Sequence, residues 1–164
     1  MFRRTAVQSA LAIALIASLG ACATHAPAPQ AVAVTLAQTP SLDTFNALVT
    51  QAGLTDTLKG TGPYTVFAPS DAAFKAVPEK TMAELRSNPA MLKDVLSYHI
   101  VPGNITATEV RPGKIKTLQG ASLDLSRAGA FITVEDAMVE KADIQATNGT
   151  VHIVDRVLMP PRKK

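Results

Sequence analysis

The sequence predicts a single α+β domain, because helical and β-rich patterns occupy different halves of the chain. Residues 41–99 carry apolar residues at helical spacing with capping signals, whereas residues 113–158 carry short β-rich runs separated by glycines. This segregation is typical of α+β folds rather than of alternating βαβ units. Residues 41–161 form the predicted domain, which has a common domain length and no internal repeat or second linker.

Five helical segments are expected in the first half. The first is predicted to start at an N-cap on Ser41 and to end at Gly53, with a short helical turn over 55–58 behind it. Its apolar stripe consists of Leu42, Phe45, Leu48, Val49 and Ala52. Ser70 is expected to cap a turn over 71–74, and Thr81 has capping-box spacing to Glu84. The pair Asn88-Pro89 predicts the start of a helix that runs to His99.

One strand is expected within the helical half, over 64–68, where β-formers stand between the break at Gly62-Pro63 and the stop at Pro69. The second half predicts short strands over 115–118, 122–125, 131–134, 138–139, 144–147 and 151–158. The pair Asn148-Gly149 is the favoured centre of a tight hairpin turn before the last of them.

The first 21 residues have the layout of a secretory signal peptide. Two arginines precede an apolar run over 10–19 that is shorter than the roughly 20 residues needed to span a bilayer. The segment Leu19-Gly20-Ala21-Cys22 is similar to the bacterial lipobox, in which cleavage before the cysteine leaves it as the lipidated first residue. We therefore expect an exported envelope lipoprotein anchored in the membrane through Cys22, with Ala23 favouring the outer membrane.

Residues 22–40 are predicted to be the lipidated cysteine and a tether, because they are rich in Ala and Pro and contain no charged residue. The stretch AVAVTLA within them is an alternative candidate for an extra edge strand. His25 lies in this segment and is expected to be a solvated spacer residue. Residues 162–164 form a short basic tail.

Composition argues against nucleic-acid binding. The formal net charge is +3, but Arg3 and Arg4 belong to the predicted signal peptide, which leaves 14 basic residues against 13 acidic ones. The mature chain has six Phe and Tyr residues and no Trp, so no basic face with stacking aromatic rings is indicated. Cys22 is the single cysteine, so stability is expected to come from the core and not from disulfides.

Three segments stand out together, namely GPYTVFAPSDAAF from Gly62, YHIVPG from Tyr98 and NGTVHIVDRVLMPP from Asn148. Their order and spacing resemble the fasciclin-like domain over about 42–161, and TLQGASLDL resembles the family's central stretch. The resemblance implies a β-sandwich or wedge of about seven strands with helices packed along one side. It also implies that the two long segments lie side by side as central strands.

We expect most polar and aromatic residues of these segments to serve packing and hydrogen bonding. His152 and Asp155 point to opposite faces of a regular strand, so they do not predict a catalytic pair. His99 closes an apolar helical stripe, and a buried imidazole is usually hydrogen-bonded. The residues assigned this structural role are Thr65, Phe67, Pro69, Ser70, Asp71, Phe74, Tyr98, His99, Asn148, Gly149, His152 and Asp155.

The sequence offers no grouping that predicts catalysis or a bound cofactor. The histidines at 99 and 152 are too far apart for HxxxH or HExxH spacing, which gives no expected metal site. No GxSxG, phosphate loop or GxGxxG pattern occurs. A hydrolase using Asp71, His99 and Asp155 is one alternative, and a carrier of a small apolar ligand between helices and sheet is another.

The predicted function is therefore non-enzymatic: an envelope-anchored module for adhesion, biofilm formation or host association through protein or glycan contacts. In animal relatives of the fasciclin family, an Asp-Ile pair before the second long motif is connected with integrin adhesion. Asp143-Ile144 occupies the matching position. The resemblance thus implies a contact role for Asp143 and Ile144, with the alternative that Asp143 fixes a loop and Ile144 fills the core.

Overall fold

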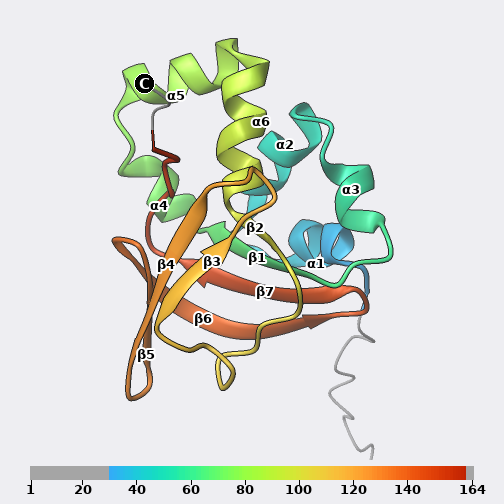
Figure 1. The fold of residues 1–164 in the computed structure, drawn as a ribbon. Helices are drawn as coiled ribbons and strands as arrows, with labels where there is room; N and C mark the ends of the chain where they lie inside the picture. Colours follow the sequence, from blue (N-terminus) through green and yellow to red (C-terminus); the bar gives the residue numbers. More distant parts are fainter. Residues whose placement is uncertain (1–29, 162–164) are drawn as a thin grey trace, which may run out of the picture.

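The computed structural model describes residues 30–161, which form one layer of helices packed on a strongly curled sheet (Figure 1). The predicted α+β class is confirmed, with all helices preceding all but one strand in the chain. In Figure 1 the helices gather above the sheet, and the last part of the chain rises beside them toward α5 and α6. No helix within residues 30–161 is long and apolar enough to cross a membrane.

Within residues 30–161, six helices make up the upper layer. They are α1 (Val32–Gln38), α2 (Asp43–Gln51), α3 (Thr55–Lys59), α4 (Asp71–Lys75), α5 (Glu79–Ser87) and α6 (Pro89–Tyr98). The side chain of Ser70 caps α4 by accepting from the Ala73 amide at 3.3 Å, as predicted. Asn88 caps α6 by accepting from the Met91 amide at 3.2 Å, with Pro89 at the first helical position.

In the described part of the chain, seven strands form a single sheet in the order β2-β1-β7-β6-β5-β4-β3. Their bounds are β1 (Tyr64–Pro69), β2 (Ile100–Pro102), β3 (Gly113–Lys116), β4 (Ser122–Ala128), β5 (Phe131–Val134), β6 (Ala137–Ala146) and β7 (Gly149–Val154). The Leu118 amide, just beyond β3, donates to the Ile100 carbonyl in β2 at 2.7 Å. This bond joins the two ends of the order, so the sheet curls into a near-barrel.

The two long signature segments form the centre of the sheet. β1 and β7 pair in parallel from Tyr64 with Gly149 to Pro69 with Val154, and all other strand pairs are antiparallel. Both strands are buried beyond their first residue. The placement implied by the fasciclin resemblance, with these segments as neighbouring central strands, is thus confirmed.

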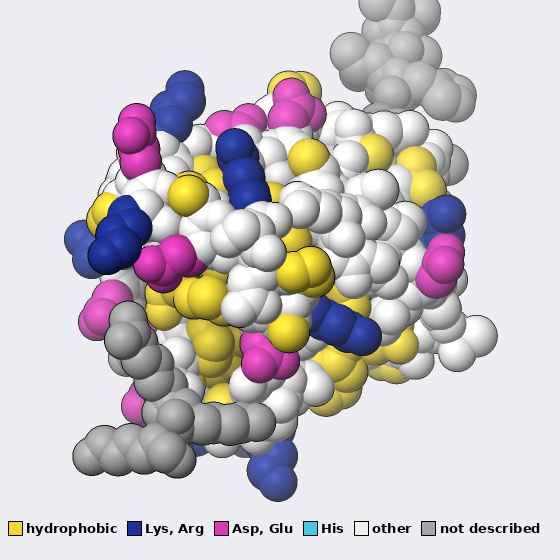
Figure 2. Space-filling view, turned by 90° about the horizontal axis from the view of Figure 1, so that it is seen from above, with side chains coloured by type: hydrophobic (Ala, Val, Ile, Leu, Met, Phe, Trp, Pro, Cys, Tyr) yellow, Lys and Arg dark blue, Asp and Glu magenta, His cyan; other side chains and the backbone are white. Residues whose placement is uncertain are grey.

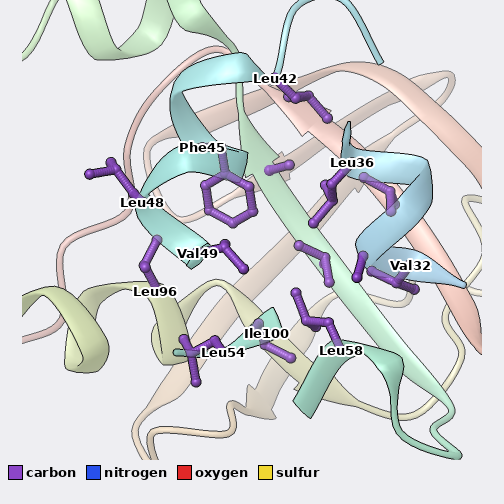
Figure 3. Packing of buried hydrophobic residues seen from close by; sticks show 14 of the residues in the cluster. Val32, Leu36, Leu42, Phe45, Leu48, Val49, Leu54, Leu58, Leu96 and Ile100 are labelled. Carbon is purple, nitrogen blue, oxygen red and sulfur yellow. The ribbon is translucent and has the colours of Figure 1, made fainter. Parts of the chain in front are cut away.

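Alternation along the two central strands divides the apolar residues into two cores. Val66, Ala68, Val151 and Ile153 face the helices and join the larger cluster around Phe45. The opposite face carries Phe67 and Val154 into a second cluster enclosed by the curled strands β4 and β5. Figure 3 shows the larger cluster, where Leu36, Phe45, Leu58, Leu96 and Ile100 converge from four helices and β2.

The segment predicted as a tether or an edge strand contains a helix instead. α1 packs against α2, α3 and β7, and its residues Val32 and Leu36 are fully buried in the larger core. A β-strand over AVAVTLA is therefore wrong, and so is a free spacer over 32–38. The apolar pair four residues apart is the helical signal, and burial against the sheet outweighs the weak helix propensity of valine.

Several predicted boundaries also differ from the structure. α2 begins at Asp43 rather than behind a Ser41 cap, and α5 begins at Glu79, which places Thr81 inside it. The two short strands expected at 138–139 and 144–147 are one strand, β6, with irregular register. β7 ends at Val154, four residues before the predicted end.

Candidate functional site

His99 is fully buried at the end of α6, with both ring nitrogens bonded to backbone groups. Nδ1 donates to the Val95 carbonyl at 2.8 Å, and Nε2 accepts from the Leu158 amide at 3.0 Å. This pattern requires the neutral ring protonated at Nδ1. Burial lowers the pKa of His99 to about 4, against the opposing effect of the Val95 carbonyl. The ring joins α6 to the segment after β7 and offers no nitrogen to a substrate.

His152 lies on the other face of the central sheet, and both of its ring nitrogens are also hydrogen-bonded to backbone groups. Its Nε2 donates to the Ile105 carbonyl at 2.8 Å, its Nδ1 accepts from the Asp143 amide at 3.3 Å, and its ring stacks on Phe67 at 5.4 Å. Burial lowers the pKa of His152, although the Ile105 carbonyl and the Asp143 carboxylate act in the opposite direction. The neutral ring therefore connects β7 to the loop over 104–110 and to β6.

Asp143 and Ile144, the expected contact pair, have different surroundings. Asp143 is exposed at a bulge of β6 with φ at 58°, and its carboxylate accepts from the Ala107 amide at 2.7 Å. Ile144 is half-buried and packs against the larger core. The aspartate thus fixes the 104–110 loop in this structure while its side chain remains at the surface.

Two further residues hold the same loop. The Thr65 hydroxyl donates to the Gly103 carbonyl and accepts from the Ile105 amide, both at 2.8 Å. Arg127 of β4 donates through Nη1 to the Ala107 and Thr108 carbonyls at 3.0 and 3.2 Å. Sequence reasoning missed Arg127, because only the curl of the sheet brings β4 to this loop. The loop over 104–110 is therefore an ordered surface feature built on the signature strands.

The three residues of the hydrolase alternative have separate partners. Asp71 accepts from the Thr44 amide at 2.9 Å at the start of α2, which lowers its pKa. Asp155 accepts from the Met138 amide at 2.7 Å across the β6–β7 pair. Neither carboxylate bonds to His99, whose two nitrogens are occupied as described above. The described hydrogen bonds thus place these residues in three separate structural roles.

Tyr98, Phe74 and Pro69 also lie inside the fold. The Tyr98 hydroxyl donates toward the Ser122 carbonyl and the Glu135 carboxylate at 3.2 Å each, and burial together with that carboxylate raises its pKa to about 12. Phe74 is buried in the larger core, and Pro69 is the last residue of β1. The phenol joins α6 to β4 and to the β5–β6 turn, so it is neither ionised nor open to reaction.

Asn148 connects three elements at one end of the central strands. Its amide nitrogen donates to the Leu58 and Gly60 carbonyls at 2.8 and 2.7 Å, and its side-chain oxygen accepts from the Val32 amide at 2.8 Å. Gly149 is the first residue of β7 and pairs with Ala146, so the β6–β7 turn is Thr147-Asn148 and the predicted turn centre at Asn148-Gly149 is wrong by one residue. A Cβ at Gly149 would overlap the carbonyl oxygen of Tyr64 in β1. Asn148 therefore belongs to the turn, and Gly149 permits the close approach of β7 to β1.

No group of three His, Cys, Asp or Glu side chains within residues 30–161 is placed to hold a metal ion. A groove of about 880 Å³ lies between α4, α5, α6 and the segment after β7. Figure 2 shows hydrophobic side chains on its floor. Sequence reasoning missed its residues, since no motif marks them. Cys22, His25 and the basic tail lie outside the described residues.

Comparison with known proteins gives consistent matches over the whole domain. The Fasciclin domain family matches residues 40–160. Protein sll1483 of Synechocystis sp. is 39% identical over 123 residues, covering 74% of this chain and 68% of that protein. Cell surface glycolipoprotein MPB83 of Mycobacterium bovis is 35% identical over 135 residues, covering 79% of this chain and 60% of that protein.

A solved structure shows the same fold at low sequence identity. A domain pair from the insect cell adhesion molecule Fasciclin I superimposes with a TM-score of 0.64 and 17% identity. The match covers 80% of this chain and 51% of the insect chain, and it extends the similarity to the overall arrangement of helices and strands.

Proposed function

Because the chain belongs to the fasciclin family, we propose that it is an envelope-anchored interaction module that acts by adhesion rather than by catalysis. Its partners are proteins or glycans met in adhesion, biofilm formation or host association. The observation that supports this proposal is the family match over 40–160, together with the fact that the polar side chains of the signature segments are already hydrogen-bonded within the fold. His99, His152 and Asp155 all bond to the backbone, which leaves contacts to surface loops.

The loop over 104–110 and the adjoining Asp143 are the proposed contact surface. The loop is held from four directions by Thr65, Arg127, Asp143 and His152, so it presents a fixed shape to a partner. A preformed loop loses little conformational entropy on binding. Many copies on one surface would add avidity to individually weak contacts.

Substitution of Asp143 separates its contact role from its structural role. Asp143→Asn keeps an oxygen acceptor for the Ala107 amide but removes the charge. If the carboxylate contacts a partner, adhesion of cells carrying this variant falls severalfold while the melting temperature stays within a degree or two. Asp136→Asn, at an exposed turn, is the matched control. Unchanged adhesion with Asp143→Asn excludes Asp143 from the contact.

The membrane anchor is proposed at Cys22, on the strength of the lipobox-like segment before it. A relative of this chain is named a cell surface glycolipoprotein, which supports an exported lipoprotein. Metabolic labelling with a fatty-acid analogue should label the wild-type protein and leave Cys22→Ser unlabelled and released from membranes. Outer-membrane placement is proposed for a Gram-negative source, and membrane fractionation tests it.

Deletion of the gene tests the function as a whole. Loss of adhesion, aggregation or surface colonisation, restored by the wild-type gene, is the expected result. All three unchanged would count against the proposal. A panel of ester, glycoside and peptide probes tests the hydrolase alternative, and turnover that His99→Ala abolishes in a folded protein would favour an enzyme.

A further inference from the structure

A groove separate from the 104–110 loop lies on the helical side of the molecule. Its walls come from α4 and the turn after it, from α5 and α6, and from the chain segment that follows β7. In Figure 2 it is the hollow with hydrophobic side chains exposed on its floor. Its volume is about 880 Å³. Small-molecule sites usually span about 300–1,000 Å³, so the groove has the size of a single ligand.

The floor of the groove is aliphatic. Ala73 and Val95 are buried beneath it, while Met91 and Val157 are half-buried and Met159 is 41% exposed. None of the described residues that line it is aromatic. These residues therefore offer no aromatic face on which a flat ring or a sugar could stack. Their flexible methionine side chains can instead adapt to an aliphatic chain. The lining suits one acyl or alkyl chain laid along the groove.

The charged residues of the groove stand at exposed positions and carry both signs. Glu84 of α5 and Asp94 of α6 contribute carboxylates, and Arg156, just beyond β7, contributes a guanidinium. A head group with one anionic and one cationic end would complement this rim.

We propose that the groove between α4, α5, α6 and the segment after β7 binds one aliphatic chain of a single-chain zwitterionic amphiphile. The chain lies on the floor formed by Met91, Val95, Val157 and Met159. Its anionic group, a phosphate or carboxylate, faces Arg156, and its ammonium group faces Glu84 and Asp94. This site is independent of the adhesion surface and of the anchor at Cys22.

Dodecylphosphocholine, held below its micelle concentration, is a probe with this chemistry. Titrated into the full-length chain, it is expected to shift amide NMR signals of groove residues in a saturable manner. Ala90→Trp, which places a large ring in the groove, is expected to weaken binding at least tenfold. Ala83→Trp, at an exposed position of α5 away from the groove, is the matched control and keeps wild-type affinity.

Head-group preference is tested with two probes of the same chain length. Dodecanoate and dodecyltrimethylammonium each satisfy half of the charged rim, so each is expected to bind several times more weakly than the zwitterion. Arg156→Gln should weaken dodecylphosphocholine binding severalfold and leave dodecyltrimethylammonium unaffected. Arg111→Gln, an exposed arginine outside the groove, should change neither.

Three outcomes would overturn the assignment. Equal loss of binding with Ala90→Trp and Ala83→Trp would place the alkyl chain elsewhere. Tighter binding of either singly charged probe would show that the head group is not zwitterionic. Shifts confined to signals outside the groove would indicate nonspecific uptake of detergent. Folding of every variant is checked by its melting temperature.

Discussion

His99 and His152 keep their rings neutral because each ring nitrogen already has a backbone partner. For His99, protonation would break the bond in which Nε2 accepts from the Leu158 amide. For His152 it would break the bond from the Asp143 amide to Nδ1. Two imidazoles that suggest acid–base chemistry in the sequence are therefore connectors between elements, and they make folding sensitive to acid.

Stability should fall between pH 6.5 and 4. The pKa of His99 is about 4 in the folded protein and near 6.5 when unfolded, so acid protonates the unfolded state first. The stabilising contribution is complete above pH 6.5 and is lost as pH falls toward 4. For His99 alone the loss between pH 7 and 5 is about 2 kcal/mol, with His152 adding in the same direction.

Urea unfolding at pH 7 and pH 5 measures this loss. His99→Gln removes the titrating ring and should flatten the dependence over this range, whatever its effect on stability at pH 7. The range lies above the ordinary pKa values of carboxyl groups, which limits their contribution. A wild-type protein equally stable at both values would show that the buried rings are not neutral in the folded state.

Gly149 should be among the least replaceable residues. Gly149→Ala would drive a methyl group into the Tyr64 carbonyl oxygen at the start of the β1–β7 pair, so we expect a loss of about 3 kcal/mol or more. Gly129→Ala is the control, since its Cβ meets open space and the cost is about 1 kcal/mol from its positive φ alone. If urea unfolding showed the same loss of stability for Gly149→Ala and Gly129→Ala, the close approach of Gly149 to the Tyr64 carbonyl would be contradicted.

Sequence motifs identified most of the residues that make structural hydrogen bonds, but they did not identify the groups to which these residues bond. Ser70 was identifiable as a cap from its local pattern, and its bond to Ala73 is local. Asp71 was not identifiable as the group that accepts from Thr44, because the two are 27 positions apart and meet only through tertiary packing. Arg127 and the groove residues were missed for the same reason.

At the scale of elements, α1 is the helix whose importance the sequence conceals. The family match begins at residue 40, yet α1 places Val32 and Leu36 in the larger core. Its alternating valines and alanines look like a strand or a spacer. The apolar pair Val32 and Leu36 is the only helical signal, and burial of this pair in the larger core, which the local pattern does not show, favours the helix.

Leu36→Ala tests whether α1 belongs to the folded unit. The side chain is fully buried, so its truncation should cost about 2–5 kcal/mol. Gln38→Ala, at an exposed position of the same helix, should change stability by less than about 0.5 kcal/mol. Thermal or urea unfolding gives both values. If Leu36→Ala left the free energy of unfolding unchanged, α1 would not be part of the folded unit.

Asn148 should be sensitive to a substitution of equal size. Asn148→Asp replaces the amide nitrogen that donates to the Leu58 and Gly60 carbonyls by an oxygen that repels them. A loss of about 3 kcal/mol is expected, because two half-buried carbonyls lose their partner beside a new charge. Asn46→Asp on α2 is the matched control and should cost under about 1 kcal/mol.

At the scale of the whole molecule, the parallel pair of β1 and β7 organises everything else. Residues 64–69 and 149–154 are far apart in the chain, and their pairing brings the helices to one face and the curled hairpins to the other. The sequence predicted the α+β class from its patterns. The strand order depends on long-range pairing, which local patterns do not contain, and it was anticipated only through resemblance to a family.

The central claim is that the signature segments form an internal framework and that the molecule acts through its surface. ¹⁵N NMR of the imidazole rings tests it most directly. Nitrogen shifts should show His99 protonated at Nδ1 and His152 at Nε2, both unchanged between pH 8 and 5.5. A ring that titrates near pH 6.5 with fast proton exchange would contradict the claim, because it would place an accessible acid–base group within these segments.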